Sequence, residues 1–442
     1  MIAPLLNSIA KSVARNTLGR LPPPAVRLSG ALAVNGGTPV RDLRLRPFAS
    51  PVNGDLSGWR TAVGPTFRRI FLSGVEGLPQ PLARSFERRW ADYCGARHAL
   101  LLPHGTDALR VALAAAFDHD GLAYGGEVIV PNLTFIASAT ACLDRRFGVA
   151  LVDVDPGSLQ LDPARVEEAI VPGRTVAIMP VHQFGQPADM TALGAIARKH
   201  GLKIIEDAAQ AHGAEWETGK VGSLGDAAGF SFQSSKNLAC GEGGILTTND
   251  DDIIARARSI YNAGRAADGG GRWEHPNLGW NIRPTEYQAA LLLHRFAGFE
   301  TQQRRKAENF AALDSELKQC ASLARLTQPA GVKRHGMYMY AMRYRAGACG
   351  GTSVERFLEA VRAEGAPVYR LYAATLSNQP AFRKIAERRP DYLRVLPTPV
   401  ADEATVDTVY IPHHIFLGSA ADMRDIAAAV RKVEAGLPAA GR

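Results

Sequence analysis

A single lysine, Lys236, follows an apolar run at residues 227–232 and precedes the segment Gly-Glu-Gly-Gly at 241–244. A strand that ends in small polar residues can hold such an amine in a crowded polar site, and the glycines let other backbone segments come close. A lysine becomes nucleophilic toward a carbonyl group when desolvation and nearby charge favour its neutral amine. The stretch therefore predicts a Schiff-base lysine, with a solvated loop lysine as the alternative.

Two acids, Glu206 and Asp207, stand at the end of a very apolar segment that begins at Leu202. A carboxylate at the end of a buried strand is costly unless a cation meets it, and a protonated pyridine nitrogen is such a cation. Gln210, three residues after Asp207, is placed to donate to an oxygen of the same ring. The alternative is a pair of acids that cap a loop.

Three further strand or helix ends carry candidates. Gly105 and Thr106 open an expected helix, where free N–H groups and the helix dipole attract an anion. Phe135 follows an expected strand and can stack on a planar ring. His182 follows another expected strand and can bind substrate or shuttle a proton. An ordinary N-cap, core packing and a structural histidine are the respective alternatives.

The elements that must position these residues alternate along the chain from about residue 60. Short apolar runs alternate with helical segments, which predicts a mostly parallel sheet with helices on both faces and ligands at the carboxyl ends of the strands. The expected strands are residues 127–130, 149–152, 176–181, 202–206, 227–232 and 243–248, and the expected helices are 79–92, 106–117, 135–143, 163–170, 189–200 and 250–261.

Composition excludes several classes of function. The 442 residues include 51 Lys and Arg against 43 Asp and Glu, a net charge of +8 that is spread along the chain. Without a basic stripe carrying interleaved aromatic residues we expect no nucleic-acid partner, and without an apolar run of roughly 18 residues we expect no membrane span. The five cysteines are odd in number and form no Cys-x-x-Cys pair, so we expect no disulfide framework, no metal site and a cytoplasmic location.

Length and pattern divide the chain into three parts. Residues 1–30 are basic, lack acids and have apolar residues near helical spacing, as in an amphipathic helix that packs on the body or in a transit peptide. Residues 31–295 are expected to form the large α/β domain that carries the site. Residues 296–442, with strand-like and helical pieces, are expected to form a smaller α+β domain.

Seven motifs in order resemble the DegT/DnrJ/EryC1/StrS family of sugar and cyclitol aminotransferases, which use pyridoxal 5'-phosphate and have fold type I. The resemblance covers about residues 30–435. The motifs are Gly-Thr-Asp-Ala-Leu at 105–109, Val-Pro-Asn-Leu-Thr-Phe at 130–135, Pro-Val-His-x-x-Gly at 180–185, Glu-Asp-Ala-Ala-Gln-Ala at 206–211, Phe-Ser-Phe-x-x-x-Lys-x-Leu at 230–238, Gly-Glu-Gly-Gly at 241–244 and Leu-Gly-Trp-Asn-Ile-Arg-Pro-Thr-Glu-Tyr-Gln-Ala-Ala at 278–290.

The resemblance implies a role for each motif residue. Lys236 carries the Schiff base with the cofactor, Asp207 pairs with the pyridine nitrogen, Gln210 lies near the ring hydroxyl and Phe135 stacks on the ring. The phosphate is held by Gly105, Thr106, Asp107 and Ser231. Asn281 reaches the phosphate of a second subunit, which implies a homodimer with shared active sites. Related sugar dehydratases have histidine in place of Lys236, so lysine here implies transamination.

The substrate is less closely defined by the sequence. Residues 33–41 resemble the opening of the cyclitol branch of the family, which favours a keto-cyclitol or keto-sugar acceptor, with glutamine or glutamate as donor, in secondary-metabolite biosynthesis. An arginine fork can hold the donor's carboxylate, although a plain salt bridge is an equal alternative. The candidate substrate residues are His182, His212, Arg283, Tyr338, Tyr340 and Arg343.

Three alternative functions stay open. An amino-hydroxybenzoate synthase would dehydrate and aromatise its substrate, and a nucleotide-sugar aminotransferase would take a larger acceptor. A non-catalytic partner subunit of the same fold is the third, and the presence of Lys236, Asp207 and Gln210 argues against it.

Overall fold

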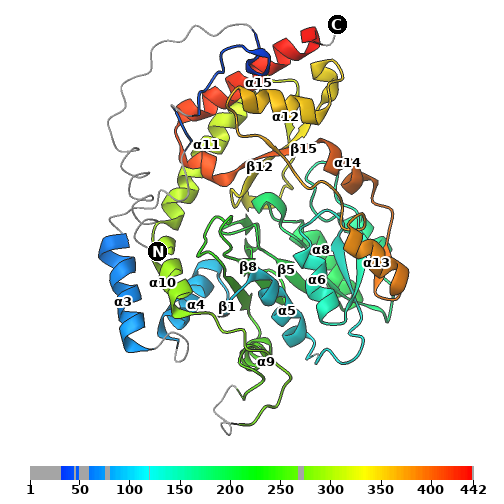
Figure 1. Ribbon diagram of the computed structural model, residues 1–442. Helices are drawn as coiled ribbons and strands as arrows, with labels where there is room; N and C mark the ends of the chain where they lie inside the picture. Colours follow the sequence, from blue (N-terminus) through cyan, green and yellow to red (C-terminus); the bar gives the residue numbers. More distant parts are fainter. Residues whose placement is uncertain are drawn as a thin grey trace.

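The computed structural model describes residues 31–43, 46–48, 59–74, 80–118, 120–266 and 273–440. A large part is built on an eight-stranded sheet and a smaller part on a four-stranded sheet (Figure 1). This is the predicted α/β architecture with a smaller C-terminal α+β part, so the fold-class prediction is confirmed. The N-terminal helix expected within residues 1–30 lies outside the described residues.

The large sheet has the strand order β1-β9-β8-β5-β4-β2-β3-β14. β9 is antiparallel to both of its neighbours, and the other neighbouring pairs are parallel, as predicted for a mostly parallel sheet. The strands are β1 (His98–Leu102), β2 (Glu127–Pro131), β3 (Gly148–Val152), β4 (Thr175–Ile178), β5 (Lys203–Asp207), β8 (Ala227–Ser231), β9 (Gly244–Thr248) and β14 (Leu393–Val395).

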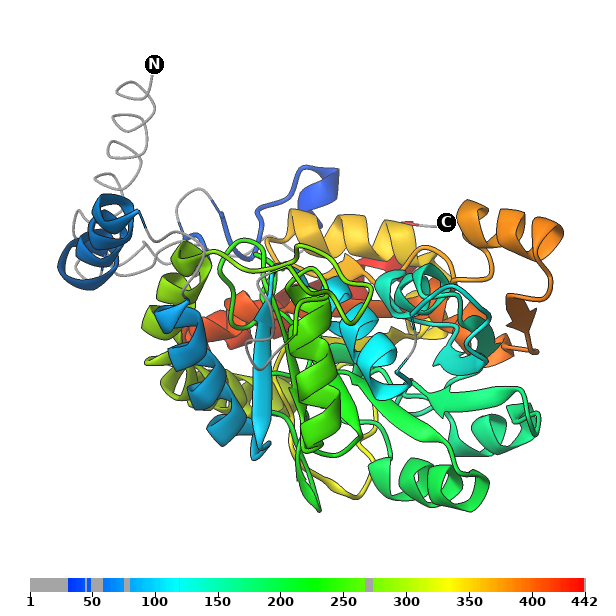
Figure 2. The same ribbon diagram turned by 90° about the horizontal axis from the view of Figure 1, so that it is seen from below.

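Helices cover both faces of this sheet because each face carries apolar side chains, and their burial away from water stabilises the fold. α5 lies directly on β8, since a Cβ added at Gly229 would stand 2.8 Å from the side chain of Leu109. The helices around the sheet, seen from below in Figure 2, are α4 (Pro81–Cys94), α5 (Gly105–Ala116), α6 (Ala137–Asp144), α7 (Pro163–Ala169), α8 (Met190–His200), α9 (Asp251–Tyr261) and α10 (Glu286–Phe296).

The smaller part has the strand order β10-β12-β15-β13 and its own apolar core. Leu32 packs in this core, and the Arg41 guanidinium pairs with Asp422 and Asp425, so the first described residues lie against the smaller part. The elements are β10 (Leu323–Arg325), β12 (Met339–Tyr344), β13 (Tyr369–Arg370), β15 (Thr408–Pro412), α11 (Phe299–Leu317), α12 (Val354–Ala363) and α15 (Ala420–Ala440).

Shorter elements connect and flank the two parts. They are η1 (Ala33–Asn35), η2 (Trp59–Val63), α3 (Gly64–Ser73), η3 (Gln183–Gly185), β6 (Glu215–Trp216), β7 (Gly219–Lys220), β11 (Val332–Arg334), η4 (Ala346–Cys349), α13 (Pro380–Arg388), α14 (Pro399–Asp407) and η5 (His413–Leu417). Among the described residues, no helix is both long and apolar enough to cross a bilayer. The same residues contain no group of His, Cys, Asp and Glu suited to a metal ion.

Candidate active site

The N-terminus of α5 faces the carboxyl end of β8. A Cβ added at Gly105 would stand 2.7 Å from the Cβ of Ser231, so the two residues are in close contact and a larger residue at 105 would clash. No side chain caps the helix, and the carboxylate of Asp107 is bonded by His104 and Arg110 instead. The first-turn N–H groups therefore remain available to an anion.

Asp207 ends β5 as a buried carboxylate beside this helix end. Its Oδ2 accepts a hydrogen bond from Ser138 Oγ at 2.7 Å, and its Oδ1 accepts one from the Ala209 N–H at 3.1 Å. Burial raises the pKa of Asp207, while these two bonds and the charge of Lys236 oppose that rise. The carboxylate is thus held in place and lacks a close cationic partner among the described side chains, which suits it to a cationic ligand.

Lys236 lies in the loop after β8 and is half-buried. Its Nζ donates to Tyr338 Oη at 3.5 Å and lies 4.8 Å from the centre of that ring. The Tyr338 ring stacks on His413, whose Nε2 bonds to the carbonyl oxygen of Ser235. Residues just before β12 and at the start of η5 therefore cover the lysine loop from the side of the smaller part.

Phe135 lies on the carboxyl side of β2 with an exposed ring, 61% accessible. Its carbonyl oxygen accepts a hydrogen bond from Ser138 Oγ at 3.2 Å, and the same hydroxyl contacts Asp207. One helical turn therefore joins the aromatic candidate to the acidic candidate. An exposed phenyl ring beside polar groups is suited to cover a planar ligand.

Gln210 is buried within a network of amides. Its Oε1 accepts a hydrogen bond from the Phe184 N–H at 2.8 Å, and its Nε2 donates to Gln183 Oε1 and Tyr372 Oη. Phe184 has a φ of 64°, which a bulky residue adopts only when its surroundings hold it there. Gln210 therefore holds η3 in its conformation, and Tyr372 brings the smaller part to the same place.

His182 and His212 are fully buried. His182 Nε2 bonds to Glu206 at 3.0 Å, and its Nδ1 accepts from the Ala188 N–H, so both of its nitrogens are engaged within the protein. His212 Nε2 bonds to the Ser231 carbonyl oxygen, and burial, with the nearby Lys236 charge as a lesser cause, lowers its pKa to about 3. The neighbouring carboxylates therefore have different partners: Glu206 bonds to His182 and Asp207 to Ser138. This follows because consecutive strand residues point to opposite faces of the sheet.

The structure does not bring Tyr340, Arg343 or Arg283 to the lysine. The Tyr340 hydroxyl donates to Asp314 within the smaller core, Arg343 pairs with Asp407 at 2.6 Å, and Arg283 donates to Asn262 at 2.8 Å. Asn281 is exposed in a segment that also exposes Trp273 and Leu278.

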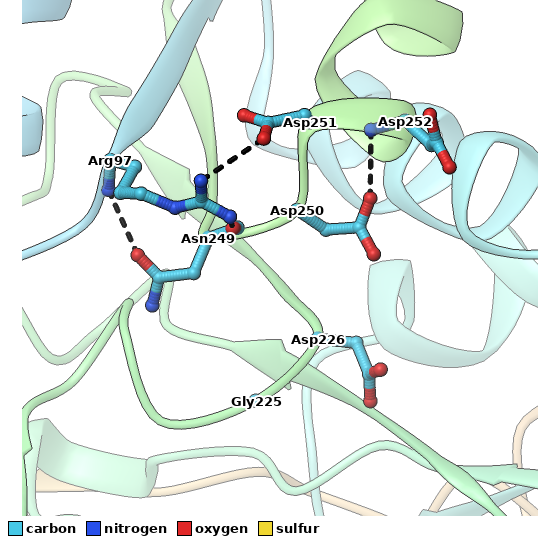
Figure 3. A pocket seen from close by; sticks show the side chains of 7 residues that line it. All are labelled: Arg97, Gly225, Asp226, Asn249, Asp250, Asp251 and Asp252. Carbon is cyan, nitrogen blue, oxygen red and sulfur yellow. Dashed lines mark hydrogen bonds and ion pairs between the residues drawn. The ribbon is translucent and has the colours of Figure 1, made fainter.

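An open hollow at the opposite edge of the sheet is separate from this site (Figure 3). Its lining residues come from the amino ends of β1 and β8 and from the start of α9. Its acids are used locally: Asp251 pairs with Arg97 and His98, and Asp250 caps α9. The acids of the hollow therefore cap a helix and form surface ion pairs.

Sequence reasoning missed Ser138, Tyr372 and His413. Ser138 stands three residues after Phe135, which is one turn of helix, so its spacing was the available signal. Tyr372 and His413 come more than a hundred residues after Lys236, and nothing local indicates that the chain returns to the site there.

Comparison with known proteins gives a consistent result. The profile of the DegT/DnrJ/EryC1/StrS aminotransferase family matches residues 70–431. The chain is 35% identical to an L-glutamine:2-deoxy-scyllo-inosose aminotransferase of Streptoalloteichus tenebrarius, over 91% of this chain and 97% of that protein. It is 39% identical to a GDP-perosamine synthase of Caulobacter vibrioides, over 78% and 88% of the two chains. A crystal structure of 3-amino-5-hydroxybenzoic acid synthase superposes with a TM-score of 0.76 at 29% identity, over 87% of this chain and 98% of that one.

Proposed function

Because the chain belongs to the DegT/DnrJ/EryC1/StrS aminotransferase family, and is therefore an aminotransferase, we propose that it moves an amino group from glutamine or glutamate to the keto group of a cyclitol or keto-sugar. The observation that carries the proposal is the meeting of three groups at one sheet edge. These are the Lys236 amine, the buried Asp207 carboxylate and the N-terminus of α5 against Ser231.

The residues present fit pyridoxal phosphate. The N-terminus of α5, whose first residue Gly105 packs closely against Ser231, offers free N–H groups and a nearby hydroxyl, which are suited to the phosphate group. Asp207 is suited to a protonated pyridine nitrogen, and the exposed Phe135 to one face of the ring. Gln210 would stand beside the ring while it holds Phe184.

When bound, pyridoxal phosphate supplies an electron sink for the substrate carbon that loses a proton. Lys236 Nζ is the basic atom placed to take up and return that proton, with Tyr338 Oη as its hydrogen-bonding neighbour. The Asp207 carboxylate would stabilise positive charge on the pyridine nitrogen, and Ser138 keeps that carboxylate oriented. Tyr338 and His413 cover the amine and reduce its contact with water.

A keto-cyclitol is the favoured acceptor. Relatives named for glutamine and deoxy-scyllo-inosose match about nine tenths of this chain, whereas the match to the GDP-perosamine synthase covers less of it. The likeness to the aminohydroxybenzoate synthase supports a runner-up in which the product becomes aromatic. A panel of scyllo-inosose, 2-deoxy-scyllo-inosose and nucleotide-linked keto-sugars, with glutamine as donor, separates these candidates. Turnover of nucleotide-sugars alone, or an aromatic ultraviolet spectrum of the product, would contradict the cyclitol assignment.

We further propose a cytoplasmic homodimer. All five cysteines are buried free thiols, which supports a reducing compartment. Trp273 and Leu278 are exposed in the segment that leads to Asn281, and large exposed apolar side chains close together in the chain support an interaction surface. A second copy of the chain would cover them and receive Asn281 at its phosphate site.

Mixing two inactive variants tests this dimer. Lys236→Ala and Asn281→Ala each disable their homodimer, but a hybrid places both defects at one shared site and leaves the other intact. We expect roughly a quarter of wild-type activity after random subunit exchange, since about half of the dimers are hybrids. Activity is measured after denaturation and joint refolding, with each variant refolded alone as control. No recovery would show that Asn281 serves its own subunit.

Ser138→Ala tests the support of the acidic group. The bond from Ser138 to Asp207 is charge-assisted and contributes about 1.5–3 kcal/mol, so we expect kcat to fall by roughly tenfold to a hundredfold. Steady-state kinetics and the dissociation constant for pyridoxal phosphate measure the effect. The matched control is Thr140→Ala, because the Thr140 hydroxyl bonds within its own helix. Equal kinetics of the two variants would contradict this role for Ser138.

A further inference from the structure

Lys306 is a fully buried lysine on α11. Its Nζ donates to Asn237 Oδ1 at 2.9 Å and to Gln303 Oε1 at 3.4 Å. Among the ion pairs of the described residues, none includes Lys306, and burial lowers its pKa to about 7. A buried amine that has only amide partners lowers the stability of the folded protein. A lysine that is retained at such a position is therefore a candidate for a functional role.

The partners of Lys306 join the two loops that meet at the active amine. Asn237 directly follows Lys236, and its Nδ2 donates to the Gly336 carbonyl oxygen at 2.5 Å. Gln303 Nε2 donates to the same oxygen at 2.8 Å. Gly336 stands two residues before Tyr338, whose hydroxyl oxygen accepts a hydrogen bond from the Lys236 amine. The cluster of Lys306, Gln303, Asn237 and Gly336 is therefore anchored on α11, the helix that leads from α10 into the smaller part (Figure 1).

The donor character of Lys306 sets the orientation of the Asn237 amide. An ammonium or amine can donate to Asn237 Oδ1, which leaves Nδ2 to face the Gly336 carbonyl oxygen. The reversed amide would place two oxygens against each other. An apolar residue at 306 would leave Asn237 Oδ1 buried without its donor, and the tie between the two loops would weaken.

We propose that Lys306 is a positioning residue for Lys236: through Asn237 it holds the lysine loop against the Gly336–Tyr338 segment and so keeps the Lys236 amine beside Tyr338 Oη. The proposal rests on the proposed function only in taking Lys236 as the amine that binds the cofactor. Lys306 itself is not proposed to touch cofactor or substrate.

The charge on Lys306 gives the stability of the protein a distinct pH dependence. The titratable groups that face it are His212, His413 and His414, and burial, more than the Lys306 charge, lowers the pKa of all three. The folded-state pKa of Lys306, about 7, lies below its ordinary value of 10.5. The destabilisation is therefore complete below pH 7 and diminishes as the pH rises toward 10.5.

The test compares stability with covalent capture of pyridoxal phosphate by the full-length chain stripped of cofactor. In that capture the Lys236 amine and the cofactor aldehyde join and water leaves, and the visible absorbance reports the rate. For Lys306→Met we expect a higher melting temperature, with a larger gain at pH 6 than at pH 9, together with capture slowed at least tenfold. The control is Lys384→Met, because Lys384 is exposed on α13.

A double-mutant cycle with Asn237→Leu completes the test. We expect Asn237→Leu to slow capture as Lys306→Met does, and the double variant to be no slower than either one. Capture within twofold of wild type, or effects that multiply in the double variant, would overturn the proposal. If Lys306→Met does not fold, the rate at which Asn237→Leu captures pyridoxal phosphate tests the proposal without it. Capture that depends on Lys306 in a chain that transfers no amine would overturn the proposed function and leave this inference standing.

Discussion

Lys236→Ala is expected to abolish amino transfer, with a loss of about 10³-fold or more, because the variant lacks both the amine that binds the cofactor and the base that moves the proton. The single-turnover reaction with glutamine measures this directly. The protein should still bind pyridoxal phosphate, since the α5 N-terminus, Ser231 and Asp207 are unchanged. Lys384→Ala, an exposed lysine on α13, is the control and should retain wild-type rates.

Borohydride gives a second readout of the same variant. In the wild-type protein it should remove the visible absorbance of the lysine-bound cofactor and leave a mass increase on the peptide that contains Lys236. The variant should show neither change. Normal activity in Lys236→Ala, or a reduced cofactor on another lysine, would contradict the assignment of the amine.

Asp207→Asn is expected to lower kcat by roughly 10²–10³-fold, the size of effect seen when a charge-stabilising group is removed from an active site. The amide keeps the shape of the carboxylate but cannot neutralise a protonated ring nitrogen. Steady-state kinetics with glutamine measure the loss. Unchanged kcat would show that Asp207 does not face the cationic part of the cofactor.

The stability of the cofactor-free Asp207→Asn protein should change in the opposite direction. Burial raises the folded-state pKa of Asp207, so ionisation costs stability as the pH rises through the ordinary carboxyl range and above it. The neutral amide avoids that cost, and we expect a higher melting temperature at pH 7 than in wild type. At a pH below the ordinary carboxyl range both side chains are neutral, and the difference should vanish.

Glu206→Gln is the matched contrast, one residue away on the same strand. The Glu206 carboxylate accepts hydrogen bonds from the N–H groups of Gly222, Leu224 and Gly225 as well as from His182. An amide would turn a donor toward these donors, and we expect a loss of about 2–4 kcal/mol in the free energy of unfolding. The variant that folds should keep its cofactor spectrum, because Glu206 points away from the site.

The sequence predicted most of the sheet and the strand-end residues, because parallel strands bring their carboxyl ends to one edge. Residues 338–343 are less regular than their strand-like pattern indicates. Residues 338 and 340 would share one face of a regular strand, but β12 starts only at Met339, and Met337 has a φ of 54° that turns the chain before it. Tyr338 therefore reaches Lys236, while Tyr340 enters the smaller core.

Lys306 shows a second limit of local pattern. The charged and polar residues of α11 predict that a lysine on this helix is solvated. Lys306 is buried instead, because the lysine loop and the Gly336 segment, which come from distant parts of the chain, cover it. Gln210 is similar: its place at a strand end was predictable, but its bond to the strained Phe184 N–H was not. Such contacts arise from tertiary packing, for which a single sequence carries no periodic signal.

Transfer of nitrogen from glutamine labelled with ¹⁵N at its α-amino group tests the central claim most directly. The purified protein, loaded with pyridoxal phosphate, is mixed with labelled glutamine and a keto-cyclitol, and the product is analysed by mass spectrometry. We expect an aminocyclitol that carries the label, formed in equal amount with the oxo acid and absent with Lys236→Ala. A cofactor-loaded protein that leaves every keto-cyclitol and keto-sugar of the panel unlabelled would contradict it.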